Sequence, residues 1–235
     1  MVTLRLFFLL LVLSFFLSNR VTAQDSISSH QHDTVLNRNL TISYTIDLVS
    51  KERNNGIGET YNGGLKTVFI SGSNARVRLV SLMRIQSIFL LPKANIKGEA
   101  VIVKESGKNK YKTYLSGNDW KNYNSKYDSA TCLFTTDSIT ILGYPCRKAL
   151  VSLQDNRSIT VYYTDSLRNP IFGTVDPAFK CIPGIVLKYE YSYKKGTISY
   201  TAANISTDKI TPDVFKVPSQ GYAIRKFSGA KSAED

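Results

Sequence analysis

Short runs in which apolar and polar residues alternate, each bounded by turn-forming residues, constrain the fold of this chain more than any other feature. In residues 42–48 every second side chain is apolar, which is the period of a β-strand with one buried face. Glycine-containing turns follow, such as residues 106–109 between the runs 100–105 and 110–115. The sequence therefore predicts a mainly β fold of antiparallel hairpins, and not alternating β–α–β units.

Further strands are predicted in pairs around turn residues. These hairpins comprise residues 66–71 with 75–80, 150–153 with 158–164, and 185–193 with 197–203. Residues 81–91 fit both a helical stripe and a buried strand, so their structure stays open. One helical turn is expected at 211–215, where Thr211 would cap the turn and Pro212 would take the first helical position.

The first 23 residues have the layout of a cleaved signal peptide. Arg5 precedes an apolar run over residues 6–17, and residues 21–23 (Val-Thr-Ala) supply the cleavage site. The run is shorter than the roughly 20 apolar residues that a transmembrane helix needs. We therefore expect export to the periplasm or the cell surface, with no transmembrane span after cleavage.

The remaining chain is expected to form one domain. Residues 24–38 are polar and are predicted to be a flexible lead-in, residues 39–222 to be the β-rich domain, and residues 223–235 to be a disordered tail. Removal of 23 of the 235 residues leaves 212, which is enough for one domain with a sizeable core.

The chain is strongly basic, with 30 Lys and Arg against 18 Asp and Glu and a formal net charge of +12. Because an exported protein meets anionic lipids and envelope proteins, we expect no nucleic-acid partner. Lys104, Lys108, Lys110 and Lys112 surround one hairpin loop and are predicted to form a basic surface patch that docks on an anionic surface or an envelope protein. The simpler interpretation is a solvated hairpin whose lysines protect a sheet edge.

No residue pattern points to catalysis. The only histidines, His30 and His32, lie in the polar lead-in, and acidic residues such as Asp137 and Asp155 fall mostly in predicted turns. The sequence contains no phosphate-binding glycine loop, nucleophile elbow or Cys-x-x-Cys motif. We therefore expect a protein that is not an enzyme, with no catalytic residues, no metal site and no cofactor.

A row of aromatic residues is the most informative candidate site. Leu187, Tyr189, Tyr191 and Tyr193 alternate with polar residues, and Tyr163 extends the same pattern on a neighbouring strand. One interpretation is a curved sheet face that binds a hydrophobic ligand, with tyrosine hydroxyls placing its polar end. The other is ordinary core. A face closed by other elements is core, whereas a face left partly open is a groove.

Three stretches resemble, in order, motifs of the GLPGLI family, a group of exported proteins of Bacteroidetes. Residues 141–149 (ILGYPCRKA), 161–164 (VYYT) and 179–187 (FKCIPGIVL) are similar to the family segments I-x-G-Y-x-C-K-K-A, W/Y-Y-T and G-L-P-G-L-I-L. Cys181 replaces the first glycine of the last segment. Within these motifs, Pro183-Gly184 is expected to turn the chain into a buried strand and Gly143 to admit a close backbone approach.

The C-terminal third also resembles the related DUF4412 group and the outer-membrane-lipoprotein-carrier-like (LolA-like) proteins, at residues 200–202, 213–215 and 217–218. The resemblance implies a single curved antiparallel sheet with little helix, a half-barrel around a hydrophobic groove.

The three cysteines are Cys132, Cys146 and Cys181, and in an exported protein two of them are expected to pair. With Asp155-Asn156 as a two-residue hairpin loop, Cys146 would lie opposite Asp165, at the sheet end where the strand that follows Cys181 begins. A Cys146–Cys181 disulfide is therefore expected, with Cys132–Cys146 as the alternative.

These observations predict an exported, non-enzymatic β-rich module that binds a lipid or another hydrophobic ligand in a half-barrel groove. The alternative is an envelope scaffold or partner protein associated with an outer-membrane system, in which the aromatic face serves only as core.

Overall fold

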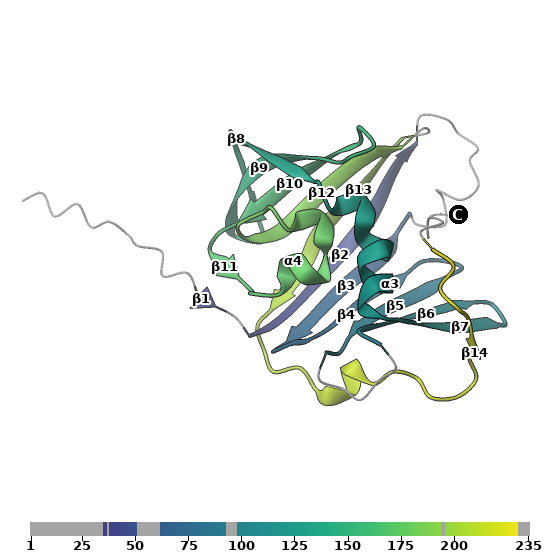
Figure 1. The fold of residues 1–235 in the computed structure, drawn as a ribbon. Helices are drawn as coiled ribbons and strands as arrows, with labels where there is room; N and C mark the ends of the chain where they lie inside the picture. Colours follow the sequence, from purple (N-terminus) through teal and green to yellow (C-terminus); the bar gives the residue numbers. More distant parts are fainter. Residues whose placement is uncertain (1–34, 37, 51–61, 93–97, 194–195, 230–235) are drawn as a thin grey trace, which may run out of the picture. The chain divides into compact units, whose positions relative to one another are not determined.

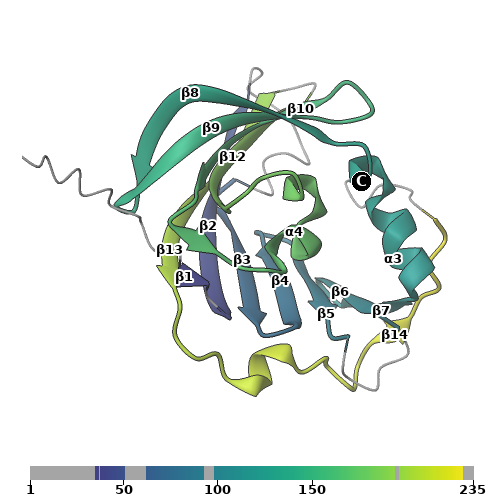
Figure 2. The same cartoon turned by 60° about the vertical axis from the view of Figure 1, so that its left-hand side comes forward.

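Successive hairpins build one large curved sheet, which does not close into a barrel (Figures 1 and 2). The computed structural model describes residues 35–36, 38–50, 62–92, 98–193 and 196–229. Every described residue lies within residues 33–235, which form one compact unit. The predicted signal peptide and most of the predicted lead-in therefore lie outside the described residues.

The sheet has twelve strands in the order β14-β7-β6-β5-β4-β3-β2-β13-β12-β10-β9-β8. Neighbouring strands are antiparallel except for β14, which runs parallel to β7. The mainly β, curved-sheet fold predicted from the sequence is confirmed. The strands are β2 (Asn39–Ser50), β3 (Gly64–Ser71), β4 (Asn74–Val80), β5 (Ile85–Leu90), β6 (Ala100–Ser106), β7 (Asn109–Leu115), β8 (Thr131–Ile141), β9 (Tyr144–Ser152), β10 (Ser158–Thr164), β12 (Ile185–Tyr193), β13 (Gly196–Ser206) and β14 (Ala223–Ile224).

Short elements complete the described fold. A two-residue parallel pair joins β1 (Val35–Leu36) to β11 (Leu167–Arg168). The helical elements are α3 (Gly117–Asn124), η1 (Ser125–Tyr127), α4 (Phe172–Val175), η2 (Pro177–Phe179) and η3 (Pro212–Phe215). Residues 81–91, whose sequence fits two structures, contain β5 and are therefore mainly strand. The helical turn expected at 211–215 corresponds to η3.

Helix α3 links the two sides of the sheet. It follows β7, next to one end of the strand order, and leads through η1 to β8, the strand at the other end. The helix therefore runs along the open side of the curved sheet (Figure 2). Ser116 and Asp119 start it with a reciprocal capping box, a signature that supplies partners to the first backbone N–H groups of a helix. Trp120 and Tyr123 pack on the main core.

The concave face carries the main core, and a loop from the chain itself fills part of it. Residues 165–184, here called the inner loop, connect β10 to β12 and include β11, α4 and η2. Although β10 and β12 are direct neighbours, this connection folds back over the concave face, where α4 is seen in Figure 2. Phe172, Val175 and Phe179 of the inner loop are buried in the same cluster as Ile42 and Leu187 of the sheet.

The convex face has its own, smaller core. Phe89, Val101 and Val103 of β5 and β6 pack against Phe215 of η3. The chain then continues to β14, which pairs with β7 through Ala223 and Ile224. Residues 223–229 were expected to belong to a disordered tail, but the backbone N–H of Arg225 donates to the carbonyl of Lys112 and Phe227 packs on Tyr123. The packed part of the chain thus extends beyond Tyr222.

Candidate functional site

The aromatic row lies on the concave face, as the alternation predicts. Tyr163 of β10 and Leu187 and Tyr189 of β12 are buried, with 2%, 0% and 7% of their surfaces exposed. Tyr191 is half-buried at the margin of the core. Tyr193 ends β12, but its side chain lies outside what the structure describes.

The chain itself covers the inner part of this row. Phe179 of η2 meets Tyr189 edge-on, with ring centroids 4.9 Å apart, and Tyr189 stacks on Tyr200 at 4.4 Å. Tyr44 approaches Tyr189 from the other side at 6.0 Å. Phe179 of the inner loop thus covers Tyr189, and Tyr163 and Leu187 are buried in the same cluster. This burial favours the core interpretation at these three positions, and ligand binding there stays a prediction.

A buried polar network lies beneath the inner loop. The Lys66 ammonium of β3 forms an ion pair with Asp176, which lies between α4 and η2. Lys66 also donates a hydrogen bond of 3.0 Å to the Tyr189 hydroxyl, and its Nζ lies 5.0 Å from the centroid of the Tyr189 ring. The Tyr44 hydroxyl donates to the carbonyl of Val186 at 2.7 Å. Asp176 thus ties the inner loop to β3, while the hydrogen bonds of Lys66 and Tyr44 join β3 and β2 to β12.

Burial and charge shift the pKa values in this network. Burial acts to lower the pKa of Lys66, but the Asp176 carboxylate and the neighbouring tyrosines together outweigh it, and the net shift is upward. Burial raises the pKa values of Tyr44 and Tyr189, so both phenols stay protonated. The network thus holds one cation, one anion and two neutral hydroxyls. Its charges pair with each other inside the protein and are not exposed to solvent as a free acid or base.

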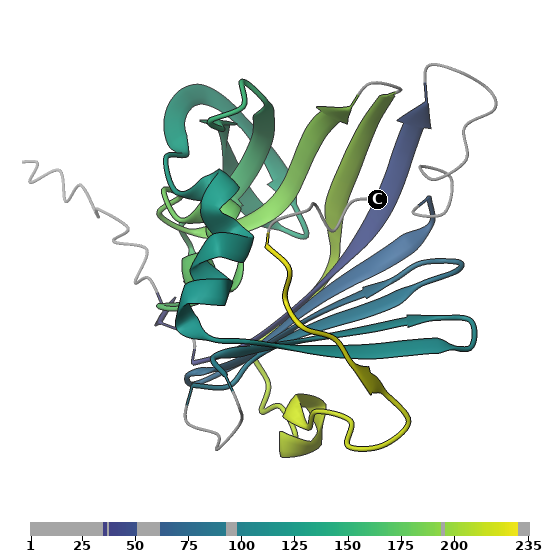
Figure 3. The same cartoon turned by 45° about the vertical axis from the view of Figure 1, so that its right-hand side comes forward.

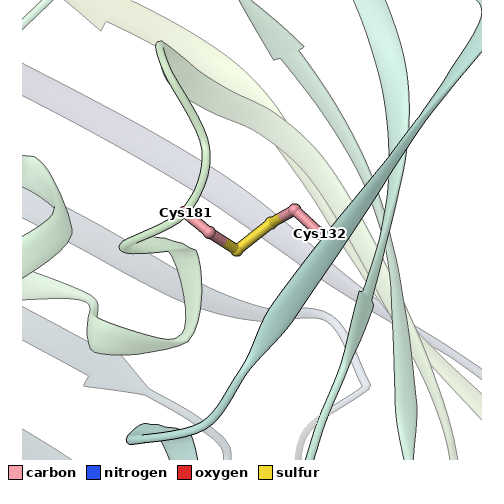
Figure 4. Close-up of a disulfide and its surroundings, with 2 residues drawn as sticks. All are labelled: Cys132 and Cys181. Carbon is pink, nitrogen blue, oxygen red and sulfur yellow. A yellow bond between two sulfur atoms is a disulfide. The ribbon is translucent and has the colours of Figure 1, made fainter.

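The disulfide joins Cys132 of β8 to Cys181 of the inner loop, with Cα atoms 6.0 Å apart (Figure 4). The predicted Cys146–Cys181 pair is wrong, and so is the alternative Cys132–Cys146. The prediction assumed a two-residue loop at Asp155-Asn156, but Leu153 and Arg157 close a longer loop through a backbone hydrogen bond. The register between β9 and β10 therefore differs by one residue from the predicted one, and Val161 lies opposite Ala149. A one-residue shift changes the face of the sheet to which a side chain points, so the predicted pairing of Cys146 loses its basis.

Cys146 is the free cysteine among the described residues, and it is buried. Burial raises the pKa of its thiol to about 11, and its Sγ donates to the carbonyl of Tyr144 at 3.4 Å. A buried, protonated thiol is a weak nucleophile, so Cys146 fits a packing role.

The predicted basic patch does not form one surface. Lys104 lies directly opposite Tyr111 in the β6–β7 pair, whereas Lys110 lies opposite Glu105, so Lys104 and Lys110 point to different faces of the sheet. Lys112 is almost fully buried, and its ammonium donates to the carbonyls of Pro218 and Ser219 at 2.7 and 3.1 Å. Lys108 stays exposed at the hairpin turn. Only Lys108 and Lys110 therefore present exposed cations together.

Strand β8 is a second candidate site that the sequence analysis missed. It ends the strand order, so among the described strands only β9 pairs with it. Leu133 and Phe134 expose 64% and 49% of their surfaces, and Ile139 is also exposed. A bulge between Phe134 and Ser138 divides the strand. The available signal was the β-branched and aromatic run of residues 131–141, which is typical of a strand.

Metal-ligating side chains do not cluster in the described ranges. No three His, Cys, Asp or Glu side chains there gather closely enough to hold a metal ion. His30 and His32 lie outside those ranges. In the described part of the chain, no helix combines the length and hydropathy required to cross a bilayer.

Comparison with known proteins adds solved structures of low similarity. No protein-family model matches the chain, and neither does any curated protein; membership of the GLPGLI family thus stays a prediction. The structure of PNGF-II in space group P21 aligns with a TM-score of 0.42 and 18% identity, over 80% of this chain and 31% of that one. The crystal structure of MucB aligns with a TM-score of 0.35 and 12% identity, over 77% and 57%.

A third similar structure is the Pseudomonas aeruginosa MucA/MucB complex, with a TM-score of 0.32 and 11% identity over 77% of this chain and 56% of that one. The chain therefore spans between about a third and just over half of the length of the proteins in these structures.

Proposed function

We propose that this protein is an exported, non-enzymatic module that binds another envelope protein along the outer edge of β8, with its aromatic face as core. The proposal rests on the contrast between the aromatic face and the edge strand β8. Tyr189 and its neighbours are covered by the inner loop, whereas Leu133 and Phe134 of the edge strand are exposed.

The two ends of the sheet differ in how they are protected. At one end, two-residue β14 covers part of β7, a strand rich in lysine. At the other end, β8 is eleven residues long and contains no Lys, Arg or Pro. Its one charged residue, Asp137, accepts a hydrogen bond of 2.9 Å from Lys148 of β9. The bulge between Phe134 and Ser138 interrupts the edge, but the segments on either side of it, 131–134 and 138–141, contain none of the residues that normally block pairing. These two segments favour the addition of a partner strand.

The occupant that best fits this edge is an extended segment of an acidic protein. The chain carries a formal net charge of +12, so two copies placed edge to edge would repel each other. The cations beside β8 are already paired, Arg147 with Asp165 and Lys148 with Asp137, so the attraction comes from the net charge of the chain. An apolar strand flanked by carboxylates would pair with the backbone of β8 and would be attracted by this net positive charge.

Site-specific photo-crosslinking in host cells tests the proposal. Benzoylphenylalanine placed at Ile139 should yield one discrete adduct with another protein, mapped to an extended segment of it. Leu133→Lys should abolish the adduct, because a lysine is a natural block of edge pairing. Leu142→Lys is the matched control, since Leu142 is an exposed leucine in the turn just beyond β8, and it should leave the adduct unchanged.

Three results would overturn the proposal. The first is the absence of an adduct. The second is an adduct that survives Leu133→Lys, which would place the contact elsewhere. The third is an adduct with the mass of two copies of this chain, because it would make the edge a self-association surface.

Lipid binding on the aromatic face would require the inner loop to move. A lipid seated on Tyr189 would have to displace Phe179 and break the ion pair between Lys66 and Asp176. The disulfide at Cys181 restrains the same loop. We therefore place partner binding ahead of lipid binding as the proposed function.

A further inference from the structure

Two hairpin turns at one end of the sheet combine exposed apolar and cationic side chains. The first is Ser81–Arg84 between β4 and β5, and the second is Ser106–Asn109 between β6 and β7; together they are called the hairpin rim. Ile85 pairs with Glu105, so the two turns project side by side from the same end of the sheet (Figure 3). They belong to neighbouring hairpins and lie far along the strand order from β8.

The apolar part of the rim is a tight turn that no other described element covers. Ser81 and Arg84 close it through a backbone hydrogen bond of 2.9 Å. The two residues at its tip, Leu82 and Met83, expose 86% and 65% of their surfaces. Leu65, which lies beside the same end on β3 opposite Val80, is also exposed. Large apolar side chains gathered on a surface mark a contact with a partner or a membrane.

Cations lie near this apolar tip on both hairpins. Arg84 is in the first turn and Lys108 is in the second, and Lys104 and Lys110 occupy the adjoining ends of β6 and β7. Glu105 is already engaged by the Tyr222 hydroxyl at 2.7 Å and by Lys110 at 3.4 Å. Burial and the charges of Arg84 and Arg225 lower the pKa of Lys104, as expected where like charges lie close together.

We propose that the hairpin rim docks the protein on an anionic lipid surface, with Leu82 and Met83 entering the interface and the surrounding cations meeting lipid headgroups. Two apolar side chains on a narrow turn are too small to form the core of a protein interface, which buries on the order of 1,600 Å². They match the depth of a bilayer interface, where apolar side chains insert and cations lie at headgroup level. This docking uses residues separate from β8 and does not depend on partner binding there.

Co-sedimentation of the mature protein with vesicles tests the docking. Binding should be strong on vesicles of phosphatidylcholine mixed with phosphatidylglycerol and weak on phosphatidylcholine alone, and it should weaken as salt is added. Leu82→Ser combined with Met83→Ser should weaken binding to the mixed vesicles about tenfold or more. The matched control is Leu142→Ser, which removes an exposed leucine from a turn outside the two hairpins and should not change binding.

Charge variants separate a specific rim from general attraction. Lys108→Glu with Lys110→Glu should reduce vesicle binding much more than Lys121→Glu with Lys209→Glu, which makes the same charge change at exposed positions outside the two hairpins. Insertion is read directly from an environment-sensitive NBD dye on Met83→Cys. Its emission should shift to the blue on mixed vesicles, whereas the dye on Leu142→Cys should not respond.

The proposal is overturned if the protein does not bind the mixed vesicles, or if it binds them equally well without Leu82 and Met83. It is also overturned if both charge pairs have the same effect and the dye at position 83 stays in water. That last result would indicate attraction by net charge alone.

Discussion

Asp176 of the inner loop forms an ion pair with Lys66 of β3, beneath a loop that covers the aromatic face. Both side chains are largely buried, with 17% and 12% of their surfaces exposed. The pair is therefore a buried polar contact between the inner loop and the sheet, while Phe179 supplies an apolar contact on Tyr189.

Loss of the Lys66 ammonium should destabilise the fold. Lys66→Met leaves the Asp176 carboxylate buried without its cation, and we expect the free energy of unfolding to fall by about 3 kcal/mol in urea titrations. The double variant Lys66→Met, Asp176→Leu should recover most of the lost free energy of unfolding, because an apolar pair leaves no unpaired charge. The same substitution at Lys216, whose pair with Asp213 is exposed, should have little effect. Equal effects at positions 66 and 216 would contradict a structural role for the buried pair.

Alkaline pH should weaken the fold through the same network. Lys66, Tyr44 and Tyr189 all have raised pKa values in the folded protein. As the pH rises past about 10, the unfolded chain loses these protons first, so the folded state binds more protons and its stability falls. Stability from these groups should be fully present below about pH 9 and decline above it. Urea midpoints of Tyr189→Phe should fall less steeply between neutral and alkaline pH than those of the wild type; parallel curves would refute this.

The disulfide assignment predicts a defined thiol count. Without reductant, the native protein should show no reactive thiol, and the denatured protein should show one, from Cys146. Peptide mapping should link Cys132 to Cys181. Cys181→Ala should lower the free energy of unfolding by about 4 kcal/mol, because the bond closes a loop with a sequence separation of 49. A mapped peptide that joins Cys146 to another cysteine would contradict the structure.

Two glycines of the family-like motifs should respond very differently to alanine. A Cβ on Gly184 would lie 2.0 Å from the carbonyl oxygen of Thr164, so Gly184→Ala forces the base of the inner loop apart. A Cβ on Gly143 meets no atom within 4 Å, and only its φ of +81° opposes a side chain. We expect Gly143→Ala to cost about 1 kcal/mol and Gly184→Ala several times more. Thermal denaturation that ranks them in the opposite order would contradict this geometry.

Local patterns predicted the strands well because their causes are local. Alternation located β2, β12 and β13, and the turn at Gly107 located the β6–β7 hairpin. The role of Gly143 was misjudged: it follows Leu142 in a two-residue turn, where both residues have positive φ, and the close backbone approach belongs to Gly184 instead. The capping box at Ser116 and Asp119 was a readable but unused signal for α3.

The features that decide the site arise from tertiary structure and were out of reach. The sequence pattern does not predict that residues 165–184 fold back over the concave face. The helical elements in this segment, α4 and η2, contain only four and three residues, which is too short for a recognisable periodicity. The Cys132–Cys181 pair depends on that same fold-back, because it places Cys181 beside β8. The burial of Lys112 depends on the C-terminal segment, whose carbonyls engage its ammonium, whereas the separation of Lys104 from Lys110 follows from the hairpin register alone. An alternating apolar row predicts a buried face, but not what buries it.

Native mass spectrometry of the mature protein, purified from its host and then denatured, tests most directly whether the aromatic face is core. The Leu82→Ser, Met83→Ser variant should be measured beside the wild type, so that lipid carried at the hairpin rim is recognised by its loss. We predict the mass of the chain alone in that variant. A defined lipid or other apolar molecule that stays bound one to one in the variant, and is released on denaturation, would contradict the account and place a ligand beneath the inner loop.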